Sequence, residues 1–309
     1  MRWTKLGIVW RPDGSQEWAR SHAMIPTPIR IAADRVRVFV TCCDDRGIGR
    51  CGYVDVDASD PKRVLSFSDR PVLDIGRPGT FDENGVLACC VIEGERGRLY
   101  MYYVGFELGT RIRYRLLTGL AISDDGGESF CRHSECPVLE RSDSELLFRC
   151  GPFVLREQGV YRLWYVAGSE WTEVSGKAKP NYTIKYAEST DGIEWPKAGA
   201  TLLEVTDLDE HGFGRPWIAR RDESLYEMFY SIRRRSLDAY RLGYAVSRDG
   251  RQWMRTDDEL NLGVSAQGFD SQAIMYSAVI DLAGQTYCFY NGNEFGRDGF
   301  AVAVRSDAR

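Results

Sequence analysis

The chain has 309 residues, of which 43% are hydrophobic and 12% aromatic, and it carries a formal net charge of −5. This composition supplies enough apolar surface for a large core, and the acidic balance disfavours nonspecific binding to nucleic acid. No apolar run approaches the roughly 20 residues that a helix needs to cross a bilayer, so no membrane span is predicted.

A short aromatic phrase recurs along the chain at intervals of about sixty residues, which indicates internal repeats. One copy is Arg-Leu-Trp-Tyr at 162–165, and the aligned last positions are Val40, Tyr103, Tyr165, Tyr230 and Tyr290. Units of this length account for the whole chain. Even repeats of this size are typical of a continuous array or a closed propeller rather than of separate domains.

A second phrase follows the first in the three central units. An alternating strand pattern ends in serine and leads into Asp-Gly, at 123–126, 189–192 and 247–250. Asp-Gly supplies the positive φ that a tight hairpin requires. Residues 52–56 and 299–303 resemble the first and fifth copies without the full turn. Each unit is therefore predicted to be an antiparallel meander, and the chain an all-β, five-bladed β-propeller of four-stranded antiparallel blades.

The predicted blades occupy approximately residues 20–68, 78–140, 145–200, 210–260 and 265–309 of a single domain, 1–309. The last unit leaves no room for an outer strand. We expect residues 1–10 to supply that strand and to close the ring. Residues 176–180, Gly-Lys-Ala-Lys-Pro, are predicted to form a solvated loop within the third unit.

The nine cysteines show no Cys-x-x-Cys spacing and the chain has only three histidines, so no zinc site is predicted. Reduced thiols that fill core space are the expected state, as is usual in the cytosol. Residues 1–7 lack the apolar stretch and small-residue site of a signal peptide. We therefore expect a cytoplasmic protein, and the sequence predicts no cofactor.

The starts of the innermost strands matter most for function, because in a propeller they surround the central axis. An apolar anchor precedes four of them, at Phe81, Phe148, Phe213 and Phe269. The anchors keep the repeat period, whereas the residues that follow them vary between acid and arginine. Such variation at a repeated position indicates a purpose other than packing.

Three acids near these starts are the catalytic candidates: Asp82, Asp270 and Glu83. Paired carboxylates on opposite sides of a sugar are the usual apparatus for cleaving a glycosidic bond. One protonates the leaving oxygen, and the other acts as base or nucleophile. The alternative is that Asp82 and Asp270 cap turns at strand starts, as aspartate often does.

Arginines at the same starts suggest an anionic ligand, because guanidinium groups suit carboxylate and phosphate. Arg149 and Arg215 are the main candidates, and neutralising nearby carboxylates is the alternative for both. The run Arg233–Arg235 is more typical of a solvated edge. The remaining substrate-binding candidates on the predicted rim are Arg46, Asp45, His22, Gln272, Tyr276, Glu170 and His211.

Five meander units with a Ser-x-Asp-Gly-x-x-Trp type of turn resemble the five-bladed propellers of the arabinanase, invertase and levansucrase superfamily and their β-mannoside phosphorylase relatives. The ending Tyr290–Asn293, Tyr-Asn-Gly-Asn, looks like uncharacterised members, some of them associated with bacterial surface-sugar gene clusters. The resemblance implies a carbohydrate-active protein in polysaccharide metabolism. It also allows a structural calcium ion, but no cluster of ligand residues in this sequence requires one.

In the hydrolases of this group, three acids come from the inner strands of the first three blades. Asp82 falls where the helper aspartate would lie, but Ile25–Pro28 occupies the place of the first acid. Arg149-Cys150 stands where the proton-donating Glu-Cys pair would be, and an arginine cannot donate that proton. The resemblance therefore leaves three alternatives: acids that have moved, to Asp270 and Glu210; phosphorolysis, with arginines cradling phosphate; or no catalysis.

The leading hypothesis is an enzyme, hydrolase or phosphorylase-like, that acts on an anionic glycoside or sugar phosphate in an axial funnel. The alternative is a non-catalytic sugar-binding propeller derived from such an enzyme, and a third possibility is a protein-interaction platform. The predicted partner is a small anionic carbohydrate and not a nucleic acid. The sequence leaves the oligomeric state open.

Overall fold

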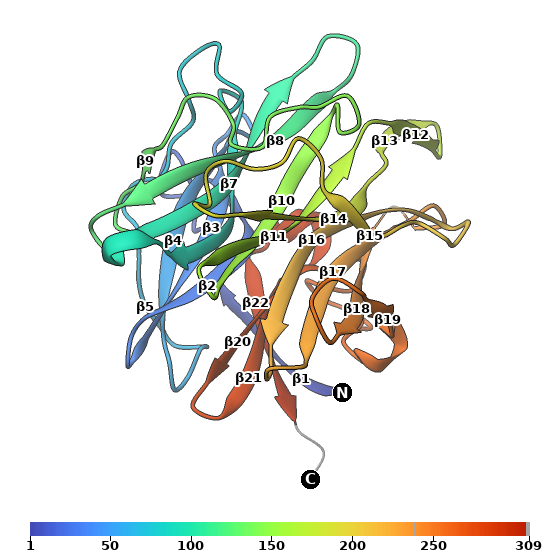
Figure 1. Cartoon of the computed structure of the whole chain (residues 1–309). Coiled ribbons are helices and arrows are strands. Elements are labelled where there is room, and N and C mark those ends of the chain that lie inside the picture. Colours follow the sequence, from blue (N-terminus) through green and yellow to red (C-terminus); the bar gives the residue numbers. More distant parts are fainter. Residues whose placement is uncertain (238, 307–309) are drawn as a thin grey trace.

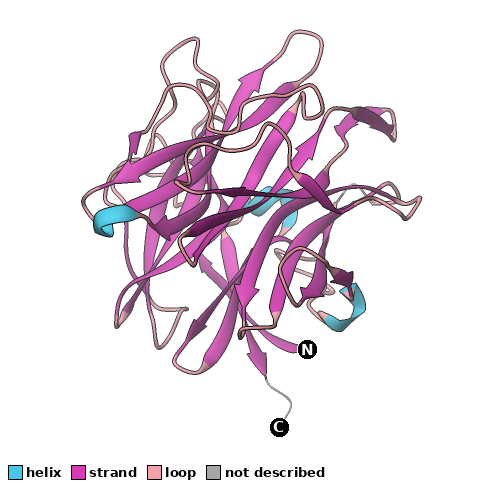
Figure 2. Cartoon of the chain, viewed as in Figure 1, coloured by secondary structure: helices cyan, strands magenta, loops and turns pink. Residues whose placement is uncertain are grey.

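A computed structural model describes residues 1–237 and 239–306, and strands dominate it (Figure 2). In the described residues the main strands pair into five groups of four, which we number as blades in chain order. The all-β propeller fold is therefore confirmed, and the strand pairing is consistent with five blades. The assignment of residues 1–309 to a single domain stays a prediction.

Each blade is a meander that runs from an inner to an outer strand (Figure 1). Blade 1 contains β2 (Ser21–Ala32), β3 (Arg35–Cys43), β4 (Gly49–Asp57) and β5 (Val64–Phe67). Blade 2 contains β6 (Val86–Glu93), β7 (Leu99–Leu108), β8 (Tyr114–Ser123) and β9 (Cys131–Arg132). Blade 3 contains β10 (Phe148–Glu157), β11 (Val160–Gly168), β14 (Thr183–Ser189) and β15 (Ala200–Leu203).

Blade 4 contains β16 (Glu210–Arg220), β17 (Tyr226–Arg234), β18 (Tyr240–Ser247) and β19 (Met254–Arg255). Blade 5 contains β20 (Met275–Leu282), β21 (Gln285–Asn291), β22 (Phe300–Ser306) and β1 (Arg2–Trp10). Between β11 and β14 lies a separate hairpin, β12 (Trp171–Val174) and β13 (Lys177–Pro180). The short helical turns are η1 (Glu95–Gly97), η2 (Asp257–Glu259) and α1 (Asn293–Gly296).

The N-terminal strand closes the ring, as predicted. β1 pairs antiparallel with β22, from Arg2 opposite Ser306 to Trp10 opposite Phe300. In Figure 1 the blue N-terminal strand lies beside the red strands of blade 5. Blades 2 and 3 are joined differently, because Leu116 and Leu117 of β8 pair in parallel with the start of β10 and merge the two blades into one eight-stranded sheet.

The repeated tyrosine of the aromatic phrase is a buried structural group. Its hydroxyl donates to a buried or half-buried carboxylate in blades 2, 3, 4 and 5, and a cation contacts that carboxylate. The four groups are Tyr103–Asp82–Arg132, Tyr165–Glu145–Arg149, Tyr230–Asp257–Arg255 and Tyr290–Asp270–Lys5. We call these contacts the tyrosine–acid–cation groups. In blades 2, 4 and 5 the cation comes from the outer strand, and in blade 5 that strand is β1.

The glycine of the second phrase makes room for this tyrosine. A Cβ atom at Gly119 would lie 2.4 Å from the Tyr103 ring, and one at Gly243 would lie 2.4 Å from the Tyr230 ring. Both separations are far below van der Waals contact, so a side chain there would displace the ring. The glycine and the tyrosine of neighbouring strands therefore form one packing unit.

The Ser-x-Asp-Gly turns fasten each blade to the preceding one. Within a turn, the aspartate accepts from backbone N–H groups, as Asp191 does from Ile193 and Glu194, both at 2.9 Å. The carbonyl of the turn glycine accepts from the preceding blade: Arg37 to Gly126, Tyr102 to Gly192 and Trp164 to Gly250. The same turn geometry, repeated in three blades, thus closes the hairpin and contributes to the contact between neighbouring blades.

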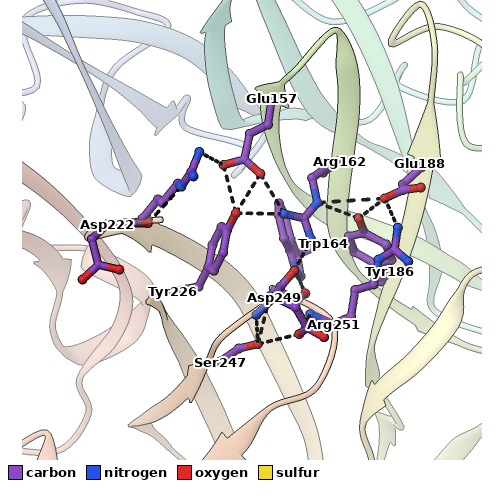
Figure 3. A network of polar contacts seen from close by, with 12 residues as sticks. Glu157, Arg162, Trp164, Tyr186, Glu188, Asp222, Tyr226, Ser247, Asp249 and Arg251 are labelled. Carbon is purple, nitrogen blue, oxygen red and sulfur yellow. Dashed lines mark hydrogen bonds and ion pairs between the residues drawn. The ribbon is translucent and has the colours of Figure 1, made fainter. Parts of the chain in front are cut away.

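Figure 3 shows the seam between blades 3 and 4. Arg162 of β11 donates to Glu157 and to the hydroxyls of Tyr186 and Tyr226. It also donates to the carbonyl of Asp249 in the turn. This network spans both blades, so we assign it to the architecture.

All nine cysteines are free in the structure, and seven of them are buried. In the described part of the chain, no helix is long and apolar enough to cross a membrane.

Candidate functional site: an axial funnel

All five inner strands bulge near their starts. The register breaks between Met24 and Thr27, Ala88 and Cys90, Cys150 and Phe153, Gly214 and Trp217, and Met275 and Ala278. A bulge re-aims side chains and often lies beside a functional site. The five residues inside these breaks that line one small chamber are Ile25, Cys89, Gly151, Arg215 and Tyr276.

Four of these bulge residues have a left-handed backbone, with φ of 54° at Ile25, 56° at Gly151, 33° at Arg215 and 56° at Tyr276. This conformation is costly for a side chain other than glycine, above all for a β-branched one. The buried Asn291 holds Ile25 in place, since its Oδ1 accepts from the Ile25 N–H at 2.7 Å. The bulges are therefore a built feature of the axis.

The inner chamber, with a volume of about 70 Å³, is mostly apolar and adjoins a larger outer cavity of about 420 Å³. Arg233 and Tyr240 line both, and we call the two together the axial funnel. The outer cavity is lined by aromatic and basic residues from blades 2, 3 and 4 and by the loops of blade 5. Its basic and aromatic side chains are Arg113, Tyr114, Trp171, Lys177, Lys179, His211, Arg233, Tyr240 and Phe295.

The hairpin β12–β13 forms one wall of the outer cavity through Trp171, Lys177 and Lys179. The prediction of a loop at 176–180 is therefore wrong, because 177–180 form a strand, although 176–178 are exposed as predicted. Ser175 and Gly176 both have positive φ, 51° and 73°, which is the geometry of a two-residue hairpin turn. The hairpin also contacts blade 4, because Arg235 donates to Thr172 and to the carbonyl of Glu173.

The two arginines of the funnel that are not exposed, Arg215 and Arg233, have no carboxylate partner among the described residues. Arg215 is 3% exposed and donates to three neutral oxygens, those of Tyr276, Thr27 and Cys89. It thereby ties together the bulges of four blades. Burial lowers the pKa of Arg215 to about 10, which still leaves it charged at neutral pH.

Arg233 is half-buried between aromatic rings. Its guanidinium lies 4.7 Å from the ring centre of Tyr182 and 4.9 Å from that of Tyr240, and its Nε donates to the Tyr240 hydroxyl. Cation–π contacts hold the charge in place without neutralising it. The funnel therefore has an excess of positive charge at its narrow end.

Four predicted site residues line the funnel. Arg215 and Tyr276 line the inner chamber, and His211 and Gln272 line the outer cavity. Burial, followed by the neighbouring Arg233, lowers the pKa of His211 to about 4. His211 is therefore neutral at neutral pH.

The structure does not bring Asp82 and Asp270 together. Asp82 is 0% exposed and accepts from Tyr103 and Arg132, whereas Asp270 is 1% exposed and contacts Lys5 at 2.6 Å. Neither lines the funnel. Both belong to tyrosine–acid–cation groups, in which the tyrosine of the same blade donates to the carboxylate, and the catalytic pair stays a prediction.

Arg149 is likewise structural, since its Nε lies 2.7 Å from the buried Glu145. Glu83 accepts from the Gly79 N–H and closes a turn. Arg46, Asp45 and Glu170 are exposed and line neither part of the funnel.

His22 lies beside the rim, where burial, followed by Arg297, lowers its pKa. It does not line either cavity. Glu210, a possible relocated acid, points to another face and forms a bidentate ion pair with Arg255.

Sequence reasoning missed Arg113, Tyr114, Lys177 and Lys179, and it favoured a solvated edge for Arg233. The alternation of side chains along strand β17 could have indicated the position of Arg233. Tyr230 and Ile232 face the core, and Arg233 and Arg234 then point to opposite sides of the strand. Arg233 and Arg234 therefore cannot both face the funnel, and Arg234 lies near Asp207, Asp209 and Glu210.

Solved structures with the same fold include a protein described as a glycoside hydrolase, with 20% identity over 99% of this chain and 93% of that chain and a TM-score of 0.73. A thermostable family-43 glycoside hydrolase has 16% identity over 93% and 91% of the two chains, with a TM-score of 0.70. The GH43_1 enzyme from Xanthomonas citri, complexed with xylose, has 14% identity over 99% and 91%, with a TM-score of 0.65. The fold is thus that of family-43-type propellers.

No model of a known protein family matches the chain. The uncharacterized protein Rv1502 of Mycobacterium tuberculosis (strain ATCC 25618 / H37Rv) is 32% identical over 304 residues, 98% of this chain and 99% of the relative. The uncharacterized protein MT1551 of the strain CDC 1551 / Oshkosh has the same identity and coverage. The chain belongs to the family of these mycobacterial proteins.

Proposed function

We propose that this protein is a carbohydrate-active enzyme whose axial funnel binds an anionic glycoside or sugar phosphate. The observation that carries the proposal is the charge of the funnel. Arg233 and Arg215 lack a carboxylate partner among the described residues, and further basic side chains surround the outer cavity. A half-buried guanidinium without a counter-charge is suited to a carboxylate or phosphate of the ligand.

The aromatic lining supports a sugar as the carrier of that anion. Tyr114, Trp171 and Phe295 line the outer cavity, and their flat apolar faces suit the C–H face of a pyranose ring. A cavity of about 420 Å³ is within the usual size of small-molecule sites. The family-43 propeller complexed with xylose supports the same kind of ligand.

A second candidate, a sugar-binding protein without catalysis, is favoured by one observation. Glu294 is the one carboxylate among the described residues that line the outer cavity, and it is exposed and paired with Arg297 at 2.8 Å. The described lining of the outer cavity therefore does not contain the two opposed carboxylates that hydrolysis uses. Phosphorolysis remains compatible, because the cations of the funnel would also hold phosphate.

Arg233→Met tests the proposal. Isothermal calorimetry would compare galacturonate, glucuronate and glucose 6-phosphate with neutral xylose and glucose. We expect the native protein to bind an anionic sugar and Arg233→Met to weaken that binding by about 10- to 100-fold, because a charge-assisted hydrogen bond contributes about 1.5–3 kcal/mol.

Arg234→Met is the matched control, since it removes the same charge from the next residue on the opposite face, where Arg234 lies near Asp207 and Asp209. It should bind the same sugars within about twofold of the native protein. Equal affinity for charged and neutral sugars, or unchanged binding in Arg233→Met, would remove the proposal. Turnover of a bound anionic sugar separates the enzyme from the binding-only candidate.

A further inference from the structure

The wall of the funnel contains the imidazole of His211, and the protonation of one of its ring nitrogens follows from its hydrogen-bond partner. His211 lies in β16, is 5% exposed and lines the outer cavity. Its Nδ1 lies 3.4 Å from the carbonyl oxygen of Pro180 in β13. A carbonyl oxygen only accepts, so Nδ1 carries the proton and Nε2 keeps its lone pair. The site therefore holds a neutral base.

The charges around His211 are basic and come from two elements. They are Arg233 on β17, Arg235 directly after that strand and Lys179 on β13, and together with burial they keep the imidazole neutral. An anionic ligand would offset these charges and favour the imidazolium. The basicity of His211 therefore increases when an anionic substrate binds.

A proton donor lies in the same funnel. Tyr240 lines both cavities and its hydroxyl accepts from the Nε of Arg233. Burial raises the pKa of Tyr240, so the hydroxyl keeps its proton at neutral pH. A tyrosine of this kind can donate to an oxygen atom that leaves with negative charge.

We propose that the funnel catalyses β-elimination on a glycoside of a uronic acid, an inference that rests on the proposed function. Base, cation and acid are the three groups that this reaction needs, and hydrolysis needs the carboxylate pair that the outer cavity lacks. Arg233 binds the substrate carboxylate and stabilises the negative charge that develops on it. No metal or redox partner is required.

The steps balance without water. Nε2 of His211 takes the proton from C5, next to the carboxylate, and the C5–H electron pair forms the C4–C5 double bond. The C4–O bond breaks, and Tyr240 gives its proton to the leaving oxygen. The products are an unsaturated uronate and a sugar with a free hydroxyl, and solvent returns the proton from His211 to Tyr240.

The experiment uses the full chain with oligogalacturonate and oligoglucuronate. Ultraviolet absorbance follows the conjugated double bond, and calorimetry measures binding in the same samples. We expect absorbance to rise with the native protein. His211→Asn keeps an N–H donor for Pro180 but removes the base, so we expect a loss in kcat of about 100-fold or more, with KM changed little. Tyr240→Phe should show a similar loss.

His133→Asn is the matched control, because His133 is exposed and lines neither cavity. It should keep the native rate. Circular dichroism would verify that each variant folds. In the native protein, NMR titration of the His211 ring supplies a readout that needs no variant: its pKa should rise when galacturonate binds.

The outcomes separate the two proposals. Uronate bound without any unsaturated product overturns the elimination and leaves the proposed function standing. Saturated products, a native rate in folded His211→Asn, or a His211 pKa that galacturonate does not raise likewise overturn it. If no uronate or other anionic sugar binds, the proposed function fails and the elimination fails with it.

Discussion

At the scale of single residues, the tyrosine–acid–cation groups show how a buried carboxylate obtains its hydrogen bonds and a cation inside the protein. Asp82 receives the Tyr103 hydroxyl at 2.9 Å and the Nε of Arg132 at 2.8 Å, inside the protein. Such a pair adds little net stability relative to an apolar core, but removing one partner leaves the other charge uncompensated.

Asp82→Asn should therefore destabilise the protein by about 3 kcal/mol, at the low end of the usual range because Arg132 keeps some contact with water. Urea unfolding would measure the loss, and binding of an anionic sugar by the folded fraction should stay within about twofold of the native value. Asp45→Asn is the control: Asp45 is 79% exposed and lies 3.6 Å from Arg20, so its removal should cost less than about 1 kcal/mol. A stable Asp82→Asn variant that binds sugar but has lost all turnover would reinstate Asp82 as a catalytic residue.

The funnel residues show where sequence reasoning stops at this scale. Arg215 and His211 were recognised because they lie at the start of an inner strand, which the repeat locates. Asp82 and Arg149 share that position in the sequence, yet their side chains are paired in the packing between strands. Which charged side chain finds a partner depends on contacts between distant segments, and one sequence does not contain that information.

At the scale of elements, the strand repeat was predictable because each unit combines alternation with a turn that requires glycine. The hairpin β12–β13 was not, because its residues 176–180 are small or charged and lack the alternating apolar pattern. It is stabilised by contacts outside itself, such as those from Arg235 to Thr172. Elements that depend on tertiary contacts carry a weak local signal.

The pairing of glycine with tyrosine predicts the effect of a single methyl group. In Gly243→Ala, the new Cβ would lie 2.4 Å from the Tyr230 ring and 2.9 Å from the Asp257 carboxylate. Overpacking of this kind typically costs about 1–3 kcal/mol, which the midpoint of urea unfolding would report.

Gly263→Ala is the control, because a Cβ there meets nothing within 4 Å. We expect it to change the stability by less than about 0.5 kcal/mol. Equal stability of the two variants would show that the tyrosine ring does not depend on the glycine.

At the scale of the whole molecule, closure of the ring joins the two ends of the described chain. Residues of β1 supply the outer strand of blade 5, and Lys5 from that strand contacts the buried Asp270. Deletion of residues 1–10 would expose the edge of β22 and leave Asp270 without its cation. We expect the melting temperature to fall by about 10 °C or more and the protein to aggregate.

A circular permutant provides the control, since Arg2 and Ser306 are paired neighbours. A short turn that joins Ser306 to Arg2, with the new chain start at residue 11, keeps every strand of blade 5. It should melt within a few degrees of the native protein. A deletion variant that melts at the native temperature would show that β1 does not close the ring.

The bulges at the axis let the residues that line the centre of the ring differ while the strands around them keep the same arrangement. Four blades present isoleucine, glycine, arginine and tyrosine from the same left-handed backbone position, while the ladders on either side continue. Exchanging one of these residues alters the lining at the centre of the ring, and at Arg215 it also removes hydrogen bonds to three other blades. Relatives built on this plan can therefore diverge in ligand by drifting at a handful of central positions, and comparing those positions is the most direct way to sort them by substrate.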